Sequence, residues 1–291
     1  MSHTDTPVIT RFAPSPTGRL HIGHAYSALV AHDAARQAGG RFLIRIEDID
    51  TTRCRPEFEA AILDDLAWLG LEWEKPVRRQ SEHMDDYAAA LDRLGAQGLL
   101  YPCFCTRREI AASTTAPHGP EGPVYPGTCR GMAASERHSR MDNGDAYALR
   151  LNMDAALARA PRPILWHDRA AGPVTATPEL FGDVVLARKE TPTSYHLAVT
   201  VDDALQGITL VTRGHDLFDA THIHRLLQVL LDLPMPDYHH HPLLVDETGR
   251  RLAKRDRDAT LAEMRARGVT PDSLRARIDS HRRAAFTVTD C

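Results

Sequence analysis

Residues 8–50 read VITRFAPSPTGRLHIGHAYSALVAHDAARQAGGRFLIRIEDID, and this stretch decides the fold. Val8 to Phe12 is a short apolar run that predicts a buried strand, and the Pro/Gly-rich loop of residues 13–18 ends it. His21 to Ala38 has the periodicity of an alanine-rich helix, and Arg41 to Glu47 predicts a second strand. Strand, loop, helix and strand in this order start a parallel α/β sheet, whose ligands bind at the carboxyl ends of the strands.

The tetrapeptide His21-Ile22-Gly23-His24 lies at the predicted start of that helix. A helix N-terminus suits phosphate, because it offers unpaired backbone N–H groups and the positive end of the helix dipole. Gly23 lets a nucleotide approach the backbone, and the two imidazoles can donate hydrogen bonds to phosphate oxygens. A plain N-terminal helix cap is the alternative. We predict an ATP-phosphate site at His21, Gly23 and His24.

Further along the chain the amino-acid composition changes. Pro56 to Leu69 and Glu82 to Gln97 predict amphipathic helices of the same domain. From Tyr101 the chain becomes rich in Pro, Gly and Thr, and short strand-like runs follow at Tyr147 to Leu151 and Ile164 to His167. This pattern predicts a small inserted module.

The α/β pattern then resumes. Strand-like runs are predicted at Val184–Ala187, Tyr195–Val201 and Ile208–Arg213, before a helix at Asp219–Leu231. We therefore expect four parts: residues 1–100 as the first half of a Rossmann-like core, 101–183 as the inserted module, 184–249 as the second half, and 250–291 as a signature loop with a basic helical end.

Composition excludes several classes of protein. The chain has 291 residues, 43% hydrophobic and 25% charged, which is ordinary for a globular protein and rules out collagen, a coiled coil and wholesale disorder. It has no apolar run near the roughly 20 residues that cross a bilayer, and residues 1–10 do not resemble a signal peptide. We expect a cytoplasmic protein without a membrane partner.

Charge is distributed unevenly. The net charge is −4, yet Arg250 to Cys291 holds eleven basic and six acidic residues and is therefore locally +5. A basic segment on an acidic body fits the docking of one phosphate-rich partner, and equally a solvated helix face.

The five cysteines are an odd number, and three of them cluster: Cys103, Cys105 and Cys129. This is less like a disulfide framework than like a metal site accompanied by two reduced thiols. Three thiolates are good ligands for Zn²⁺, which needs a fourth, and His118 is a conventional candidate. Three reduced thiols in a loop are the alternative. For the histidine run of residues 239–241, a strand-entry or loop role is favoured over metal binding.

Several blocks together resemble the catalytic core of glutamyl-tRNA synthetases, which are class I aminoacyl-tRNA synthetases. They occur in the family's order between Thr10 and Asp256: RFAPSPTG at 11–18, HIGH at 21–24, RIEDID at 45–50, YHLAVTVDD at 195–203 and Arg213-Gly214. The resemblance implies a Rossmann core that joins glutamate to AMP by using ATP and Mg²⁺. The acyl group then passes to an RNA hydroxyl.

The residues in these blocks suit glutamate. Its two carboxylates need cationic partners and its ammonium needs an anion, and Arg11, Arg213 and Glu47 supply both. The resemblance implies a glutamate site made of Arg11, Ala13, Ser15, Glu47, Tyr195 and Arg213. An ordinary ion pair is the alternative for Glu47 and Arg213.

The second signature of such enzymes has the general form Lys-Met-Ser-Lys-Ser, and residues 251–255 read RLAKR. Arg251 and Ala253 depart from it, but Lys254 keeps the cation that neutralises the transferring phosphates. We expect Lys254, with His21 and His24, to be catalytic and to bind ATP.

Because the chain ends at Cys291, soon after Lys254, we expect no anticodon-binding domain. This resembles short paralogues of the family that esterify glutamate to the queuosine base in the anticodon loop of tRNA(Asp). The resemblance implies ATP, L-glutamate and queuosine-containing tRNA(Asp) as partners, and we expect a monomer. In these paralogues a Cys-x-Cys, Tyr-x-x-x-Cys pattern implies Tyr125 as the fourth ligand of one structural zinc ion per chain.

Three other functions stay open at this point. Small-molecule nucleotidyltransferases also use a His-x-Gly-His helix start, although they have no reason to carry a glutamate site. The altered loop around Lys254 fits a non-catalytic tRNA-binding paralogue. Conventional charging of tRNA(Glu), with a partner protein that reads the anticodon, is the third.

Overall fold

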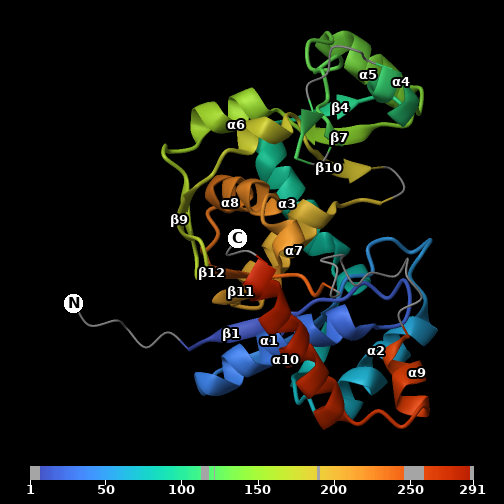
Figure 1. The fold of residues 1–291 in the computed structure, drawn as a ribbon. Helices are drawn as coiled ribbons and strands as arrows, with labels where there is room; N and C mark the ends of the chain where they lie inside the picture. The colour runs from blue at the N-terminus through green and yellow to red at the C-terminus, as the bar shows by residue number, and fades with distance from the viewer. Residues whose placement is uncertain (1–6, 113–117, 121, 189–190, 246–258, 289–291) are drawn as a thin grey trace.

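The computed structural model describes residues 7–112, 118–120, 122–188, 191–245 and 259–288, and its core begins with the predicted βαβ unit. Strand β1 (Ile9–Phe12) runs parallel to β2 (Arg41–Ile46), with Ile9 opposite Arg41, and helix α1 (Ile22–Gln37) connects them (Figure 1). Strand β3 (Glu74–Arg79) extends this sheet on the other side of β2, also in parallel. The sequence prediction for this part is confirmed.

A second sheet continues the core. Its strands lie in the order β11 (Leu210–Gly214), β12 (Asp237–His241), β8 (Leu165–Asp168) and β9 (Gly172–Thr175), and only the β8–β9 pair is antiparallel. The Thr209 amide donates to the Ile9 carbonyl at 3.0 Å, and the Ile9 amide donates to Thr209 Oγ1 at 2.8 Å. The carboxyl ends of β1, β2 and β11 therefore gather in one place.

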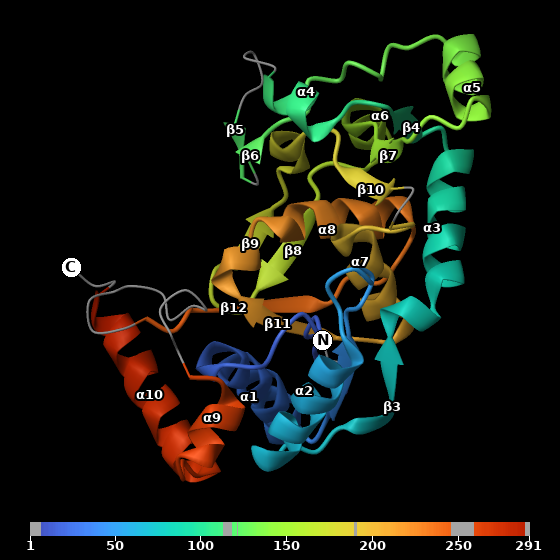
Figure 2. The same ribbon diagram turned by 90° about the vertical axis from the view of Figure 1, so that its right-hand side faces the viewer.

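Helices cover these sheets and bury two apolar cores. One core joins the first sheet to α1, α2 (Pro56–Trp68), α9 (Leu261–Ala266) and α10 (Pro271–Val288). The other packs the second sheet against α3 (Met84–Ala96), α6 (Met153–Arg159), α7 (Tyr195–Leu205) and α8 (Ala220–Leu230) (Figure 2).

A smaller module lies at one end of the molecule, at the top of Figures 1 and 2. Its antiparallel sheet has the order β10 (Val185–Arg188), β7 (Ala148–Leu151) and β4 (Leu100–Cys103). It also holds α4 (Arg107–Ala112), α5 (Ala134–Asp142) and the short pair β5 (His118–Gly119) and β6 (Gly122–Pro123). The rings and thiols of Tyr101, Phe104, Tyr125, Cys103 and Cys129 form its own core.

The strands are divided between the two parts differently from the expectation. Strand β8, expected in the inserted module, pairs with β12 of the core, whereas β10, expected in the core, pairs with β7 of the module. The residue boundaries of the four predicted parts stay a prediction.

The strand predicted at Tyr195–Val201 is wrong, because these residues form the start of helix α7. Ser194 caps the helix, its Oγ accepting from the Leu197 amide at 3.4 Å. All residues from His196 to Asp203 are buried, so the run has no polar face that marks helical periodicity. A continuous buried run of this length fits a strand and a helix equally well.

In the part of the chain that the structure describes, no helix combines the length and the apolarity that a membrane span requires.

Candidate active site

The start of α1 has the geometry of an anion site. His21 is the N-cap, and its Nδ1 accepts from the Gly23 amide at 3.1 Å, while His24 Nδ1 accepts from the His21 amide at 3.2 Å. The two rings lie 3.8 Å apart. Because Nδ1 accepts in both, each neutral ring carries its proton on Nε2 and is a donor there. The predicted alternative, an N-terminal helix cap, is present, and the phosphate site at the same residues stays a prediction.

One cavity of about 390 Å³ collects the residues that the sequence singled out. It lies where the loop after β1, the start of α1 and the end of β11 meet. Its lining includes every predicted glutamate and ATP residue except Lys254, which lies outside the described residues: Arg11, Ala13, Ser15, His21, Gly23, His24, Glu47, Tyr195 and Arg213. Residues more than 200 positions apart in sequence therefore share one cavity.

Arg213 is 6% exposed and is held only by uncharged groups. Its Nε donates to His240 Nε2 at 3.0 Å, Nη1 to His224 Nδ1 at 3.1 Å and Tyr195 Oη at 3.4 Å, and Nη2 to Thr221 Oγ1 at 2.6 Å. Burial holds the pKa of His240 down at about 3 and that of His224 well below its ordinary value, so both rings are neutral. Among the described residues no carboxylate pairs with Arg213, and its charge is available to an anionic ligand.

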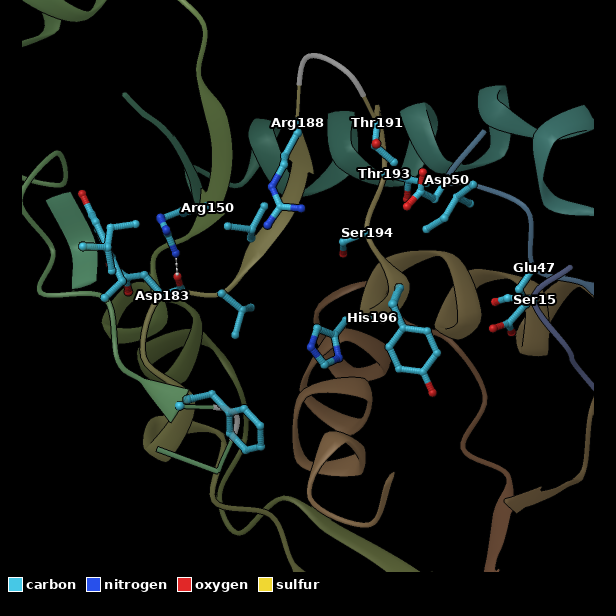
Figure 3. A pocket seen from close by; sticks show the side chains of 18 of the residues that line it. Ser15, Glu47, Asp50, Arg150, Asp183, Arg188, Thr191, Thr193, Ser194 and His196 are labelled. Atoms are coloured by element: carbon cyan, nitrogen blue, oxygen red, sulfur yellow. Dashed lines mark hydrogen bonds between the residues drawn. The ribbon is translucent and has the colours of Figure 1, made fainter. Parts of the chain in front are cut away.

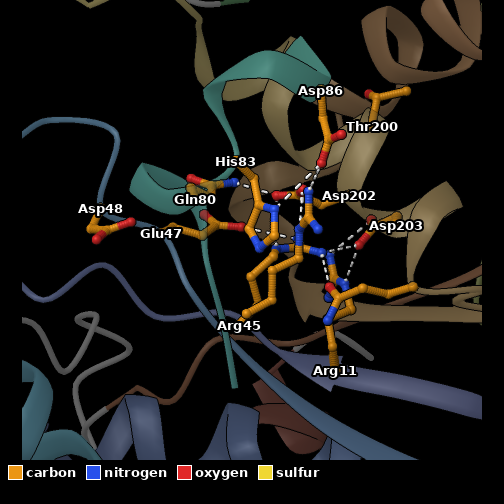
Figure 4. Close-up of polar contacts among 12 residues, drawn as sticks. Arg11, Arg45, Glu47, Asp48, Gln80, His83, Asp86, Thr200, Asp202 and Asp203 are labelled. Atoms are coloured by element: carbon orange, nitrogen blue, oxygen red, sulfur yellow. Dashed lines mark hydrogen bonds and ion pairs between the residues drawn. The ribbon is translucent and has the colours of Figure 1, made fainter. Parts of the chain in front are cut away.

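Arg11 differs, because its charge is already paired. Its Nε and Nη2 donate to the two oxygens of Asp203 at 2.9 and 3.3 Å, and Nη1 donates to the Thr212 carbonyl at 3.1 Å (Figure 4). Burial alone raises the pKa of Asp203, but Arg11 and Arg45 outweigh it and hold this pKa below its usual value. Of the two predicted arginines, Arg213 is the stronger candidate for a substrate carboxylate.

Glu47 reaches the cavity from the end of β2 and is anchored behind it. Arg45 Nη2 donates to Glu47 Oε1 at 3.0 Å, and Arg45 Nη1 donates to Asp203 at 2.7 Å. Burial raises the pKa of Glu47, and the neighbouring Arg45 and Arg11 oppose this rise. Figure 4 shows Arg45 between Glu47 and the two aspartates of α7, Asp202 and Asp203. The predicted alternative of an ion pair is thus real for Glu47, which also lines the cavity.

A second cavity, of about 640 Å³, adjoins the first and extends toward the small module. Figure 3 shows Ser15 and Glu47 at its near end and Arg150 with Asp183 at its far end, below Arg188. Ser15, Thr17, Glu47 and Tyr195 line both cavities.

The predicted metal ligands lie together in the small module. The sulfur atoms of Cys103, Cys105 and Cys129 lie within 4.8 Å of one another. Tyr125 Oη is 3.6 Å from Cys105 Sγ and accepts from the Cys129 amide at 2.8 Å. Burial raises the pKa of Cys105 to about 11. Three sulfurs and one oxygen at this spacing fit a metal ion of Zn²⁺ size, whereas the His118 side chain is outside what the structure describes.

Sequence reasoning missed the residues that hold Arg213. The histidine run forms most of strand β12 itself, and His240 within it contacts Arg213 and Asp168. No metal-ligand group among the described residues includes it. Asp168 comes from β8, and Thr221 and His224 come from α8. No local motif marks residues whose partners are distant in sequence.

The comparisons with known proteins agree with this site. Residues 7–288 match the family model for the catalytic domain of class I tRNA synthetases (E and Q), and the chain belongs to that family. The chain is 51% identical over 280 residues to the glutamyl-Q tRNA(Asp) synthetase of Rhodobacter capsulatus, covering 92% of this chain and 98% of that protein. It is 45% identical over 274 residues to the glutamyl-Q tRNA(Asp) synthetase of Symbiobacterium thermophilum, covering 91% and 83%.

Solved structures give the same fold. A glutamate tRNA ligase from Elizabethkingia meningosepticum, in complex with its amino acid, aligns over 94% of this chain with a TM-score of 0.78 and 26% identity. The chain spans 60% of that protein's length.

Proposed function

We propose that this protein activates L-glutamate with ATP to give glutamyl-adenylate, and then transfers glutamate to the queuosine base in the anticodon loop of tRNA(Asp). The observation that carries the activation step is the uncompensated guanidinium of Arg213, in the same cavity as the anion-binding start of α1. The names of the relatives from Rhodobacter and Symbiobacterium support the acceptor.

In the first step, the α-carboxylate of glutamate attacks the α-phosphorus of Mg²⁺-bound ATP in line, and pyrophosphate leaves. Arg213 holds a carboxylate and Glu47 faces the ammonium. The Nε2 protons of His21 and His24, with the positive end of the α1 dipole, stabilise the charge that develops on the phosphate oxygens. Lys254, outside the described residues, is proposed to neutralise the leaving pyrophosphate. The chain acts by positioning and charge neutralisation, with no covalent enzyme intermediate.

In the second step, a hydroxyl of the queuosine cyclopentene ring attacks the activated carbonyl and AMP leaves. The larger cavity is the proposed place of the flipped-out base, since it shares a wall with the glutamate cavity. Arg150 and Arg188 in its lining supply cations for an RNA backbone.

We also propose one structural zinc ion per chain, bound by Cys103, Cys105, Cys129 and Tyr125. The spacing of the sulfurs supports it, and so does the tyrosine oxygen close to them. The metal orders the small module, and the phosphate chemistry takes place elsewhere. We propose that the protein works as a monomer in the cytoplasm.

Transfer of labelled glutamate tests the acceptor. The enzyme is incubated with ATP, labelled glutamate and one of three RNAs: tRNA(Asp) with queuosine, the same tRNA without it, or tRNA(Glu). Label on the queuosine form alone is the expected result. Label on tRNA(Glu) overturns the acceptor in favour of conventional charging, and no label on any RNA overturns the transfer step.

Glutamate-dependent pyrophosphate exchange, without tRNA, tests activation. His24→Ala and Lys254→Ala are each expected to slow exchange by about 10²-fold or more, because each removes charge stabilisation from the reacting phosphates. His32→Ala, on the same helix but outside the cavity, is the control and is expected to keep wild-type exchange. Normal exchange in both catalytic variants contradicts the proposed site.

A further inference from the structure

A buried chain of hydrogen bonds runs from Asp168, at the end of β8, through His240 of β12 to Arg213. Asp168 Oδ2 accepts from His240 Nδ1 at 2.8 Å and from the His240 amide at 3.0 Å. Asp168 Oδ1 accepts from the Ala170 and Ala171 amides at 2.8 and 2.9 Å. Asp168 is 1% exposed and His240 2% exposed, and neither residue lines the cavity that holds Arg213.

This chain fixes the tautomer of His240. A guanidinium has no acceptor, so the Nε–H of Arg213 must donate, and His240 Nε2 must be the unprotonated nitrogen. The proton of the neutral ring is therefore on Nδ1, where the Asp168 carboxylate accepts it. Thr221 Oγ1 also lies 3.2 Å from His240 Nε2 and accepts from Arg213 Nη2. Arg213, Thr221 and His240 therefore each contact the other two.

The hydrogen bonds around Arg213 orient its guanidinium. A guanidinium has five N–H donors, and four are used by His240, His224, Tyr195 and Thr221. The fifth, on Nη2, has no partner among the described residues, and the Nη1 bond to Tyr195, at 3.4 Å, is the weakest of the four. A carboxylate that takes the remaining Nη2 donor and displaces the Tyr195 hydroxyl from Nη1 is therefore bound at two points.

We propose that Asp168 is a positioning residue that, through the His240 tautomer, orients Arg213 for a glutamate carboxylate and so sets the affinity for glutamate. The proposal deepens the proposed function and rests on it. Asp168 does not touch substrate, and it acts on the binding geometry of Arg213 alone.

Asp168→Asn separates this role from packing, because asparagine has nearly the same shape. The carboxylate accepts from four N–H groups, three of them backbone amides that can only donate. Of these four groups, only the imidazole can change from donor to acceptor, by moving its proton from Nδ1 to Nε2. The orientation of the asparagine that loses the fewest hydrogen bonds therefore points its NH₂ at His240 Nδ1. An N–H then opposes the N–H of Arg213 Nε, and the guanidinium is displaced.

The experiment measures pyrophosphate exchange in the full chain, with the KM for glutamate, the KM for ATP and kcat determined separately. Asp168→Asn is expected to raise the KM for glutamate at least about tenfold and to leave the KM for ATP within about twofold. Asp237→Asn, which alters the exposed His167–Asp237 pair on the neighbouring strand ends, is the control and is expected to behave as wild type. The rise in Tm on adding saturating glutamate should shrink in Asp168→Asn alone.

Two substitutions at His240 test the acceptor itself. His240→Gln places an amide oxygen where Nε2 stood, within reach of Arg213, and is expected to keep the KM for glutamate within about threefold of wild type. His240→Asn keeps an N–H donor toward the Asp168 carboxylate but has no acceptor that reaches Arg213, and it is expected to resemble Asp168→Asn.

The outcomes are distinguishable. Wild-type protein without glutamate-dependent exchange overturns the proposed function itself. Wild-type exchange together with an unchanged KM for glutamate in Asp168→Asn, or with equal effects of the two His240 substitutions, overturns the positioning role.

Discussion

Arg213 is a buried cation surrounded by neutral acceptors, and that arrangement costs stability. Transfer of a charge from water into an interior is unfavourable unless an opposite charge compensates it, and none does so for Arg213 among the described residues. The cost is recovered when an anionic ligand binds. The fold therefore keeps the charge of Arg213 uncompensated until an anionic ligand binds and neutralises it.

This predicts opposite effects of Arg213→Met on stability and on function. The free energy of unfolding is expected to stay unchanged or to rise, because an apolar chain of similar length replaces the uncompensated charge. Glutamate-dependent exchange is expected to fall about 10²-fold or more. Urea unfolding and exchange assays measure the two effects. Arg41→Met, at an exposed ion pair, is the control and should change neither quantity appreciably. A large loss of stability in Arg213→Met contradicts the argument.

The neutral histidines predict acid sensitivity. Burial holds the pKa of His240 at about 3, whereas an unfolded histidine titrates near pH 6.5. Between pH 6.5 and about 3 the unfolded chain therefore binds a proton that the folded state does not. Stability falls as the pH falls through this range, by up to about 1.4 kcal/mol per pH unit for this histidine.

The measurement is urea unfolding at pH 7, 6 and 5. His240→Gln should flatten the slope of unfolding free energy against pH by close to one proton. His167→Gln, at an exposed histidine on β8, should leave the slope as it is. Equal slopes in all three proteins would show that His240 is not the group responsible.

At the scale of elements, helix α7 shows what the sequence can and cannot reveal. The βαβ start was predictable because its glycines, prolines and apolar runs are local signals. The helix at Tyr195–Leu205 was not, because every residue from His196 to Asp203 is buried and no exposed polar stripe marks helical periodicity. Family resemblance still singled out Tyr195, which lines the same cavity as the other predicted glutamate residues, since a motif match does not depend on secondary structure.

The absence of a local sequence signal also explains why the residues that hold Arg213 were not predicted. The glutamate and phosphate residues were predicted from contiguous blocks such as residues 11–18 and 21–24, and the described ones line one cavity. Asp168, Thr221 and His224 lie outside those blocks. Their role depends on the pairing of β8 with β12, which the sequence placed in separate parts.

Helix α7 is also tied to the sheet by a buried carboxylate. Asp202 is fully buried and accepts from Arg78, Gln80 and Tyr87 at 2.7, 2.8 and 3.0 Å, and it lies 3.6 Å from Arg45. Asp202→Asn is expected to lower the free energy of unfolding by about 3–5 kcal/mol, because it removes a buried negative charge that Arg78, Gln80, Tyr87 and Arg45 share.

Glu74→Gln is the matched control, since its ion pair with Arg41 is about half exposed and such a pair contributes little to the free energy of unfolding. Chemical denaturation of both variants at pH 7 measures the contrast. Similar losses of unfolding free energy in the two variants would contradict the proposal that the buried network around Asp202 stabilises the fold.

At the scale of the whole molecule, the sulfur cluster and the glutamate cavity belong to separate parts. Cys103 and Cys129 pack in the core of the small module, whereas the cavity is formed by β1, α1 and β11. A metal in the module can therefore order one part without entering the chemistry of the other.

Metal analysis of reduced protein is expected to give about one zinc per chain, and Cys105→Ser should reduce it. Zinc removal by a chelator should strongly lower glutamate transfer to RNA and leave pyrophosphate exchange within about twofold, because only the acceptor side loses order. Cys54→Ser, at a cysteine outside the cluster, is the control for the metal analysis and should leave the zinc content unchanged. Zinc well below one per chain, unchanged by Cys105→Ser, contradicts the assignment.

The wall shared by the two cavities has a consequence for how their ligands communicate. Ser15, Glu47 and Tyr195 line both spaces, so any occupant of one space rests against groups that the other occupant also meets. If glutamate and the base occupy these two spaces as proposed, any linkage between their binding is reciprocal: whatever factor glutamate imposes on the affinity for the base, the base imposes on the affinity for glutamate. Such cooperativity would require no conformational change that connects the two sites, because the residues between the cavities contact both ligands directly.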